Sequence, residues 1–272
     1  MKPFQTLEPL PMMSQNRFAG LLAMFTLLSG GSANAGEAWT DIRKTVFGSA
    51  VIAEDDGVIS LEVPVRAEDA ALVPLSVKLK DDAVGRIRKI TLIVDENPSP
   101  VAAVLNFDKP SSAGMKRFAT RIRVDRYTYV RAIAETDDGS LHMNAKFIKA
   151  SGGCSAPASK DAEAALQDIG KLRAKASAGN ASTVVDIAIR HPNFTGLQID
   201  HVTRAYTPAR FIEEIRIVQA GQQIASIESG ISISENPNVR LELAPHQSGA
   251  LQIQANDTSG AKFSTTVSVT GF

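Results

Sequence analysis

The feature that most constrains the fold is a succession of short segments in which apolar and polar residues alternate. In VISLEVPV (58–65) the apolar residues occupy every second position, with Ser60 and Glu62 between them. This period of two is typical of a strand that buries one face. Six further segments in the first half resemble strands: LVPLSVKL (72–79), KITLIV (89–94), VAAVLNF (101–107), ATRIRVD (119–125), YVRAIAET (129–136) and LHMNAKFI (141–148).

Turn-forming residues separate several of these segments, as at Asp55-Asp56-Gly57, Asn97-Pro98-Ser99-Pro100 and Asp137-Asp138-Gly139-Ser140. Seven short strands at this spacing predict an antiparallel β-sandwich and therefore an all-β fold. Ahead of the strands, TDIRKTVFG (40–48) predicts a short helix that Thr40 or Asp41 caps and that Gly48 ends.

A second block of strands follows a segment of different composition. The sequence DAEAALQDIGKLRAKA is rich in Ala, Glu, Lys and Leu, which predicts a linker helix over 161–175, followed by the loose stretch SAGNAS (177–182). Six strands are expected beyond it: TVVDIAIR (183–190), FIEEIRIV (211–218), QQIASIE (222–228), NVRLEL (238–243), ALQIQAND (250–257) and KFSTTVSV (262–269). We therefore expect two immunoglobulin-like β-sandwiches, at 36–157 and 183–272, joined by a short helical linker at 158–182.

The N-terminus has the pattern of an export signal. The apolar run FAGLLAMFTLL (18–28) follows Arg17, and Ala33-Asn34-Ala35 forms an A-x-A cleavage site. We expect a cleavable signal peptide at 1–35, with Met12 or Met13 as the true start, and a periplasmic protein without a membrane anchor. A signal anchor is the alternative, although the run is shorter than the roughly twenty apolar residues that span a bilayer.

The charge balance argues against polyanionic partners. The chain has 29 basic and 29 acidic side chains, a formal net charge of zero, so no field attracts nucleic acid or anionic lipid. The four histidines, His142, His191, His201 and His246, are scattered without metal-ligand spacing, and no phosphate loop or nucleophile elbow is present. The acidic pairs lie in turns or at a strand start, where a solvated role is expected. We expect no metal and no cofactor.

The single cysteine is the candidate functional residue. Cys154 lies in KASGGCSAPASKD (149–161), behind Gly152 and Gly153, among residues too small to pack in a core. One cysteine excludes an internal disulfide, and an unpaired one in an exported chain suggests an intermolecular pair or a working thiol. We expect Gly152 and Gly153 to form a flexible arm that presents the thiol, with Lys149 favouring the thiolate. An inert loop cysteine is the alternative.

These segments also carry a family resemblance. LVPLSVKL, KITLIVDENPSPVAAVLNF, TRIRVDRYTYVRAIAETDDG and FIKASGGC resemble SoxY of the SoxYZ sulfur carrier, whose chain ends in a Gly-Gly-Cys arm. AIRHPNFTG (188–196), the stretch 207–243 and SGALQIQANDTSGAKFSTTVSV (248–269) resemble SoxZ. Both matches in this order resemble the fused SoxYZ-like carriers that are associated with quinoprotein dehydrogenases. In the two-chain form the cysteine lies beside the chain end, whereas here a whole domain follows it.

The resemblance implies a carrier that is not an enzyme. Cys154 would hold a thiosulfate-derived sulfur compound covalently, while Sox-type cytochromes and a hydrolase in the periplasm oxidise and cleave it. The alternative is an accessory or carrier protein of a periplasmic quinoprotein alcohol dehydrogenase system, with an unknown cargo. A cysteine-independent pair of structural sandwiches and a thiol hydrolase are two further hypotheses; the second has no histidine close to Cys154 in sequence.

Overall fold

The computed structural model describes residues 35–54, 57–107, 114–157, 166–179, 181–199, 204–244 and 249–271. Almost all of the expected signal peptide lies outside these residues. The elements are α1 (Ala35–Phe47), β1 (Ile52–Glu54), β2 (Ile59–Glu62), β3 (Val73–Leu79), β4 (Ile87–Val94), β5 (Val101–Asn106), β6 (Met115–Ile122), β7 (Thr128–Thr136), β8 (Leu141–Ile148), β9 (Leu172–Ala178), β10 (Thr183–Ile189), β11 (Ile212–Gln219), β12 (Gln222–Ser229), β13 (Asn238–Leu243), β14 (Ala250–Asp257) and β15 (Lys262–Gly271). The all-β prediction is confirmed, and every strand expected from the sequence is present.

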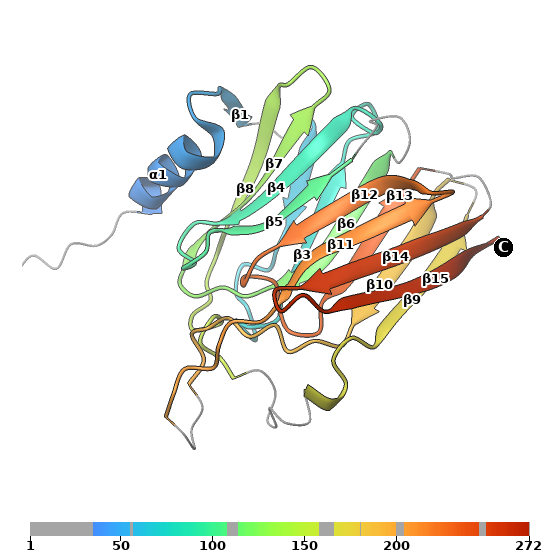
Figure 1. The fold of residues 1–272 in the computed structure, drawn as a ribbon. Coiled ribbons are helices and arrows are strands. Elements are labelled where there is room, and N and C mark those ends of the chain that lie inside the picture. Colours follow the sequence, from blue (N-terminus) through green and yellow to red (C-terminus); the bar gives the residue numbers. More distant parts are fainter. Residues whose placement is uncertain are drawn as a thin grey trace, which may run out of the picture. The chain divides into compact units, whose positions relative to one another are not determined.

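The strands form two layers with the core between them (Figure 1). One layer has the order β1-β8-β7-β4-β5-β12-β11-β14-β15, and the other has the order β9-β10-β13-β6-β3-β2. The last strand connects the layers, since β15 pairs antiparallel with β14 and parallel with β9. Inward positions alternate in several strands, as expected from the sequence: in β2, Ile59 and Leu61 are buried whereas Glu62 is exposed. The central strands β4 and β7 are buried at consecutive positions as well.

The two sandwiches are joined edge to edge in both layers. Strand β5 of the first pairs antiparallel with β12 of the second, with Leu105 opposite Ile227, and β6 pairs with β13, with Phe118 opposite Leu241. One buried apolar cluster includes these four side chains. Because sheets and core are continuous across the junction, the sandwiches are neighbours along shared sheets and not two bodies on a flexible linker.

The expected linker helix at 161–175 is wrong in its second half. Residues 161–165 lie outside the described part of the chain, and Leu172–Ala178 is strand β9, which pairs with β10 over its whole length. Gly170 adopts φ +84°, and a Cβ there would lie 2.2 Å from the Phe263 ring, so the backbone turns at this point. Leu166, Ile169 and Leu172 recur at three-residue steps, which is only a weak helix signal. Pairing with β10 and burial along one face of β9, complete at Ala176 and partial at Leu172 and Ala174, outweigh this helix propensity. Part of the expected linker, 158–182, therefore belongs to the second sandwich.

The N-terminal helix covers the outer face of the first layer. Trp39, Ile42 and Phe47 of α1 pack against a buried cluster that includes Ile133 and Met143. The helix begins at Ala35, five residues before Thr40. Thr40 and Asp41 therefore lie inside the helix and do not cap it. Gly48 ends the helix as expected, at φ +61° with its N–H donating to the Lys44 carbonyl over 3.1 Å. Within the described residues, no helix has the length and hydropathy needed to cross a membrane.

We predict that the two sandwiches unfold together. Phe118 is fully buried at the β6–β13 junction. Its replacement by Ala should lower the free energy of unfolding by about 3–5 kcal/mol, because a buried aromatic side chain is lost and a cavity remains. Amide hydrogen exchange should show β3 and β10 losing protection to the same extent.

The control is Phe147→Ala on β8, where the side chain is 39% exposed. It should have a clearly smaller effect. Loss of protection in β3 alone after Phe118→Ala would contradict a shared core.

Candidate functional site around Cys154

The segment that carries Cys154 is folded against both sandwiches. It follows β8 as the turn at 153–155, and the free Cys154 thiol is 0% exposed. The sequence predicted a flexible arm that presents this thiol to solvent. The structure places it in the interior, so the prediction of an extended arm is wrong for this conformation.

The two glycines have a packing role. The Gly152 N–H donates to the Asp125 carbonyl over 2.8 Å, and the Gly153 N–H donates to the Val124 carbonyl over 3.0 Å. A Cβ on Gly153 would lie 2.1 Å from the Ala70 carbonyl oxygen. No other residue fits this close backbone approach, and Gly152 adopts φ +80°, where a side chain is strained. Gly152 and Gly153 thus allow the chain to lie flat on the first sandwich.

The second sandwich contacts the same segment through two polar side chains from the loop after β10. The Thr195 hydroxyl donates to the Cys154 carbonyl over 2.8 Å, and the Gln198 side-chain amide donates to the Ala156 carbonyl over 3.1 Å. Gln198 also accepts from the Thr195 N–H over 2.9 Å, which fixes both side chains. No sequence pattern predicted a role for these two residues, although Thr195 lies in the SoxZ-like motif AIRHPNFTG.

Arg123 is the charged side chain beside the cysteine segment. It is 0% exposed, and its Nη1 donates to the Gly153 carbonyl over 3.1 Å. Its Nε and Nη2 find no hydrogen-bond partner among the described residues. A buried donor without a partner costs about 1–3 kcal/mol, and more when the group is charged. Burial accordingly lowers the pKa of Arg123, against the opposing effect of Glu235, Cys154 and Asp69.

The thiol is held in its protonated form. Burial raises the pKa of Cys154 to about 12, the nearby Asp125 carboxylate adds to this rise, and Arg123 opposes it. Lys149, the cation expected from the sequence, is exposed and is not among the charges that shift this pKa. Arg123 is the cation that acts on the thiol instead. In this conformation Cys154 is a poor nucleophile, because the thiolate is the reactive form.

Two asparagines in similar motifs brace the backbone, one in each domain. The Asn97 side-chain amide donates to the Arg123 carbonyl over 2.8 Å and to the Ser232 hydroxyl of the second sandwich over 2.9 Å, while its oxygen accepts from the Asp125 N–H. In the second sandwich, the Asn236 oxygen accepts from the His191 N–H over 3.3 Å. The repeated Glu-Asn-Pro motif at 96–98 and 235–237 therefore provides one bracing amide in each domain.

The histidines do not form a catalytic couple with Cys154 in the described part of the chain. His191 is buried; its Nδ1 accepts from the Asn193 N–H over 3.0 Å and its Nε2 faces the Asp257 carboxylate at 3.3 Å. Burial lowers the pKa of His191 although Asp257 favours the charged form, so the ring has a structural role. His201 and His246 lie outside the described residues. Among the described residues, no group of three or more His, Cys, Asp or Glu side chains is placed to bind a metal ion.

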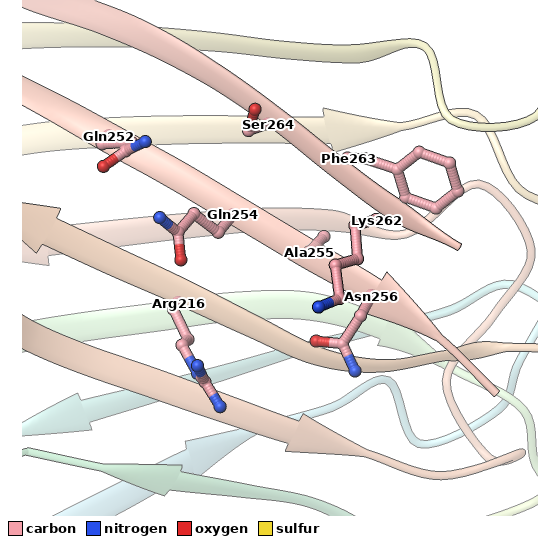
Figure 2. Close-up of a pocket in the computed structure, with 8 residues that line it drawn as sticks. All are labelled: Arg216, Gln252, Gln254, Ala255, Asn256, Lys262, Phe263 and Ser264. Atoms are coloured by element: carbon pink, nitrogen blue, oxygen red, sulfur yellow. The ribbon is translucent and has the colours of Figure 1, made fainter. Parts of the chain in front are cut away.

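Two surface pockets lie elsewhere. Figure 2 shows a pocket of about 310 Å³ on β11, β14 and β15 of the second sandwich, lined by polar side chains such as Arg216, Gln252 and Gln254. A second pocket of about 360 Å³ spans the β6–β13 junction and includes Arg121, Arg173 and Arg190. Cys154 lines neither pocket.

Two family models match the chain in succession. The model of the sulfur oxidation protein SoxY matches residues 43–154, and the model of the sulphur oxidation protein SoxZ matches residues 171–268. The SoxY match thus ends at Cys154, and the SoxZ match includes strand β9. A search of curated proteins gives no match.

Solved structures also resemble the chain. The sulfur carrier protein SoxY from Chlorobium limicola f thiosulfatophilum is 22% identical, with 43% of this chain and 94% of that chain covered and a TM-score of 0.35. A superoxide reductase (neelaredoxin) from Ignicoccus hospitalis is 15% identical, with 34% and 78% covered and a TM-score of 0.29. Because these TM-scores are low, the assignment rests on the family models. The chain belongs to the SoxYZ-like family, with a SoxY domain followed by a SoxZ domain in one polypeptide.

Proposed function

We propose that this protein is a periplasmic sulfur carrier that holds a thiosulfate-derived group covalently on Cys154. The observation that carries the proposal is the position of the only cysteine, whose segment is bonded by both domains: Arg123 of the SoxY domain donates to the Gly153 carbonyl, and Thr195 of the SoxZ domain donates to the Cys154 carbonyl. The membership of both domains in sulfur-oxidation families supports it. The attachment itself, the thiosulfate cargo and the periplasmic location are the new parts of this proposal.

The proposed loading reaction forms one sulfur–sulfur bond. The Cys154 thiol and thiosulfate give a cysteine S-thiosulfonate, one proton and two electrons. A cytochrome partner of the Sox type accepts the electrons, and a hydrolase partner later removes the terminal sulfonate as sulfate. In this proposal the protein contributes the thiol and the binding surface, and its partners carry out the redox and hydrolytic steps.

The buried thiol must open before it reacts. The segment is tethered at both ends, so opening means that the turn at 153–155 lifts as a loop. Lifting it breaks the bonds from Thr195 and Gln198, which each contribute about 0.5–1.5 kcal/mol. Lifting it also breaks the bonds of Gly153 to Val124 and Arg123, so a partner that draws the loop out must compensate for all of these bonds. While no partner is bound, the closed state keeps the thiol protonated.

We predict a sulfur adduct on Cys154 in cells. Intact-mass analysis of the protein purified from its native periplasm under non-reducing conditions should show an added mass equal to sulfur atoms or thiosulfate. Reduction should remove this mass, and the Cys154→Ser variant should never carry it. A bare thiol in cells that are oxidising thiosulfate would overturn the proposal, and an adduct of another composition would leave the carrier role and exclude the thiosulfate cargo.

We also predict slow alkylation that depends on the closed loop. The folded pKa of about 12 is raised above the ordinary value of 9.0, so ionisation opposes folding as pH rises from 9 towards 12 and has no effect below. At pH 8, iodoacetamide should modify the folded protein about a hundredfold or more slowly than the protein unfolded in urea, because its thiolate fraction is smaller.

Thr195→Val should raise the rate at which iodoacetamide modifies the folded protein about two- to tenfold, because it removes one hydrogen bond from the closed loop. Thr266→Val, at an exposed position of β15, is the matched control and should change nothing. Equal rates for folded and unfolded protein would show that the thiol is exposed in solution.

A further inference from the structure

We propose that Arg123 forms an anion subsite for the group carried on Cys154 and selects negatively charged adducts over neutral and cationic ones. The inference rests on the proposed function in one respect only, namely that Cys154 carries an adduct. No sequence motif indicated which residue would recognise the cargo or which charge the cargo must have.

The geometry places the guanidinium at the cysteine. Arg123 Nη1 donates to the Gly153 carbonyl, which belongs to the peptide bond that leads into Cys154. The Arg123 backbone is fixed from two sides, since its N–H donates to the Ser232 carbonyl over 2.8 Å and its carbonyl accepts from Asn97 over 2.8 Å. The guanidinium that this backbone carries is fully buried beside the cysteine segment.

The remaining donors of Arg123 point to a ligand. Nε and Nη2 are buried and have no partner among the described residues, although a guanidinium binds two oxygens of a planar or tetrahedral anion in a fork. The carboxylates that influence this group are Glu235 and Asp69, and neither forms a hydrogen bond with it in the described part of the chain. The positive charge is therefore only partly balanced. A sulfonate at the end of a Cys154 adduct would supply the missing acceptors and the missing charge.

A neighbouring charge opposes this selection. The Asp125 carboxylate also acts on the Cys154 sulfur and would disfavour an anion there, so the proposed selectivity requires Arg123 to dominate. Removal of the guanidinium would leave Asp125 as the charge that determines selectivity. The sign of the selectivity should then reverse, which a role for Arg123 in packing alone would not produce.

The test uses three methanethiosulfonate reagents of different charge. In each case the Cys154 thiolate attacks the sulfenyl sulfur, a disulfide forms, and methanesulfinate leaves with the electron pair of the broken bond. The reagents are methyl methanethiosulfonate, its sulfonatoethyl analogue and its trimethylammonioethyl analogue. The rate constant of each on the folded protein is divided by its rate constant on the protein unfolded in urea, which removes intrinsic reactivity.

The expected result is a normalised rate at least about tenfold higher for the anionic reagent than for the cationic one. Arg123→Met should abolish or reverse this preference, Arg123→Lys should keep part of it, and the neutral reagent reports any change in access to the thiol. The control is Arg121→Met, which removes the same charge from the end of β6, two residues before Arg123, at a pocket that Cys154 does not line. It should preserve the preference within about twofold. Equal normalised rates for the two charged reagents on the wild-type protein would overturn the proposal.

A second measurement needs no variant at Arg123. The three adducts of the wild-type protein, formed in mild denaturant and refolded, should differ in thermal stability, with the anionic adduct having the highest Tm and the cationic one the lowest. The same Tm for all three adducts would contradict the subsite. These outcomes are independent of the physiological cargo: a bare Cys154 in cells together with strong anion selectivity would remove the carrier function and leave the subsite.

Discussion

The pairing of β5 with β12 and of β6 with β13 is the interaction on which the rest of the structure depends. It makes the sheets of the SoxY and SoxZ domains continuous and gives them one apolar core. The same junction brings Thr195 and Gln198 of the second domain to the cysteine segment of the first. Without this pairing Cys154 would lose one wall of its site, so the fusion of the two domains is directly relevant to the function.

At the Cys154 site the backbone is tightly packed against the first domain, whereas only a few hydrogen bonds join it to the second domain. Gly153 lies too close to Ala70 for any side chain, which fixes the path of the chain, whereas the bonds from the second domain are few and individually small. Such an arrangement keeps the thiol protonated and covered. Arg123 adds a charged group that a closed, unloaded site leaves incompletely bonded.

The sequence predicted most of the fold because its strands have a clear period of two and its turns contain Gly, Pro, Asn and Asp. The prediction was wrong at β9, because this short strand lies in a segment of high helix propensity. Its pairing with β10, a tertiary contact, makes it a strand. The sequence identified Cys154 as the candidate residue but not its burial, because glycine permits both flexibility and close packing. Arg123, Thr195 and Gln198 lie far from Cys154 in sequence, so only the folded chain brings them together.

The SoxZ domain closes over the cysteine segment of the SoxY domain, and amide hydrogen exchange of residues 149–157 in the intact protein measures this closure. We expect slow exchange of the Gly152 and Gly153 amides, which donate to Asp125 and Val124. Exchange should be faster when the bonds from Thr195 and Gln198 are both removed by Thr195→Val and Gln198→Ala. Exchange at the rate of an unfolded peptide in the unmodified protein would contradict this closure, because Cys154 would then lie on an open arm.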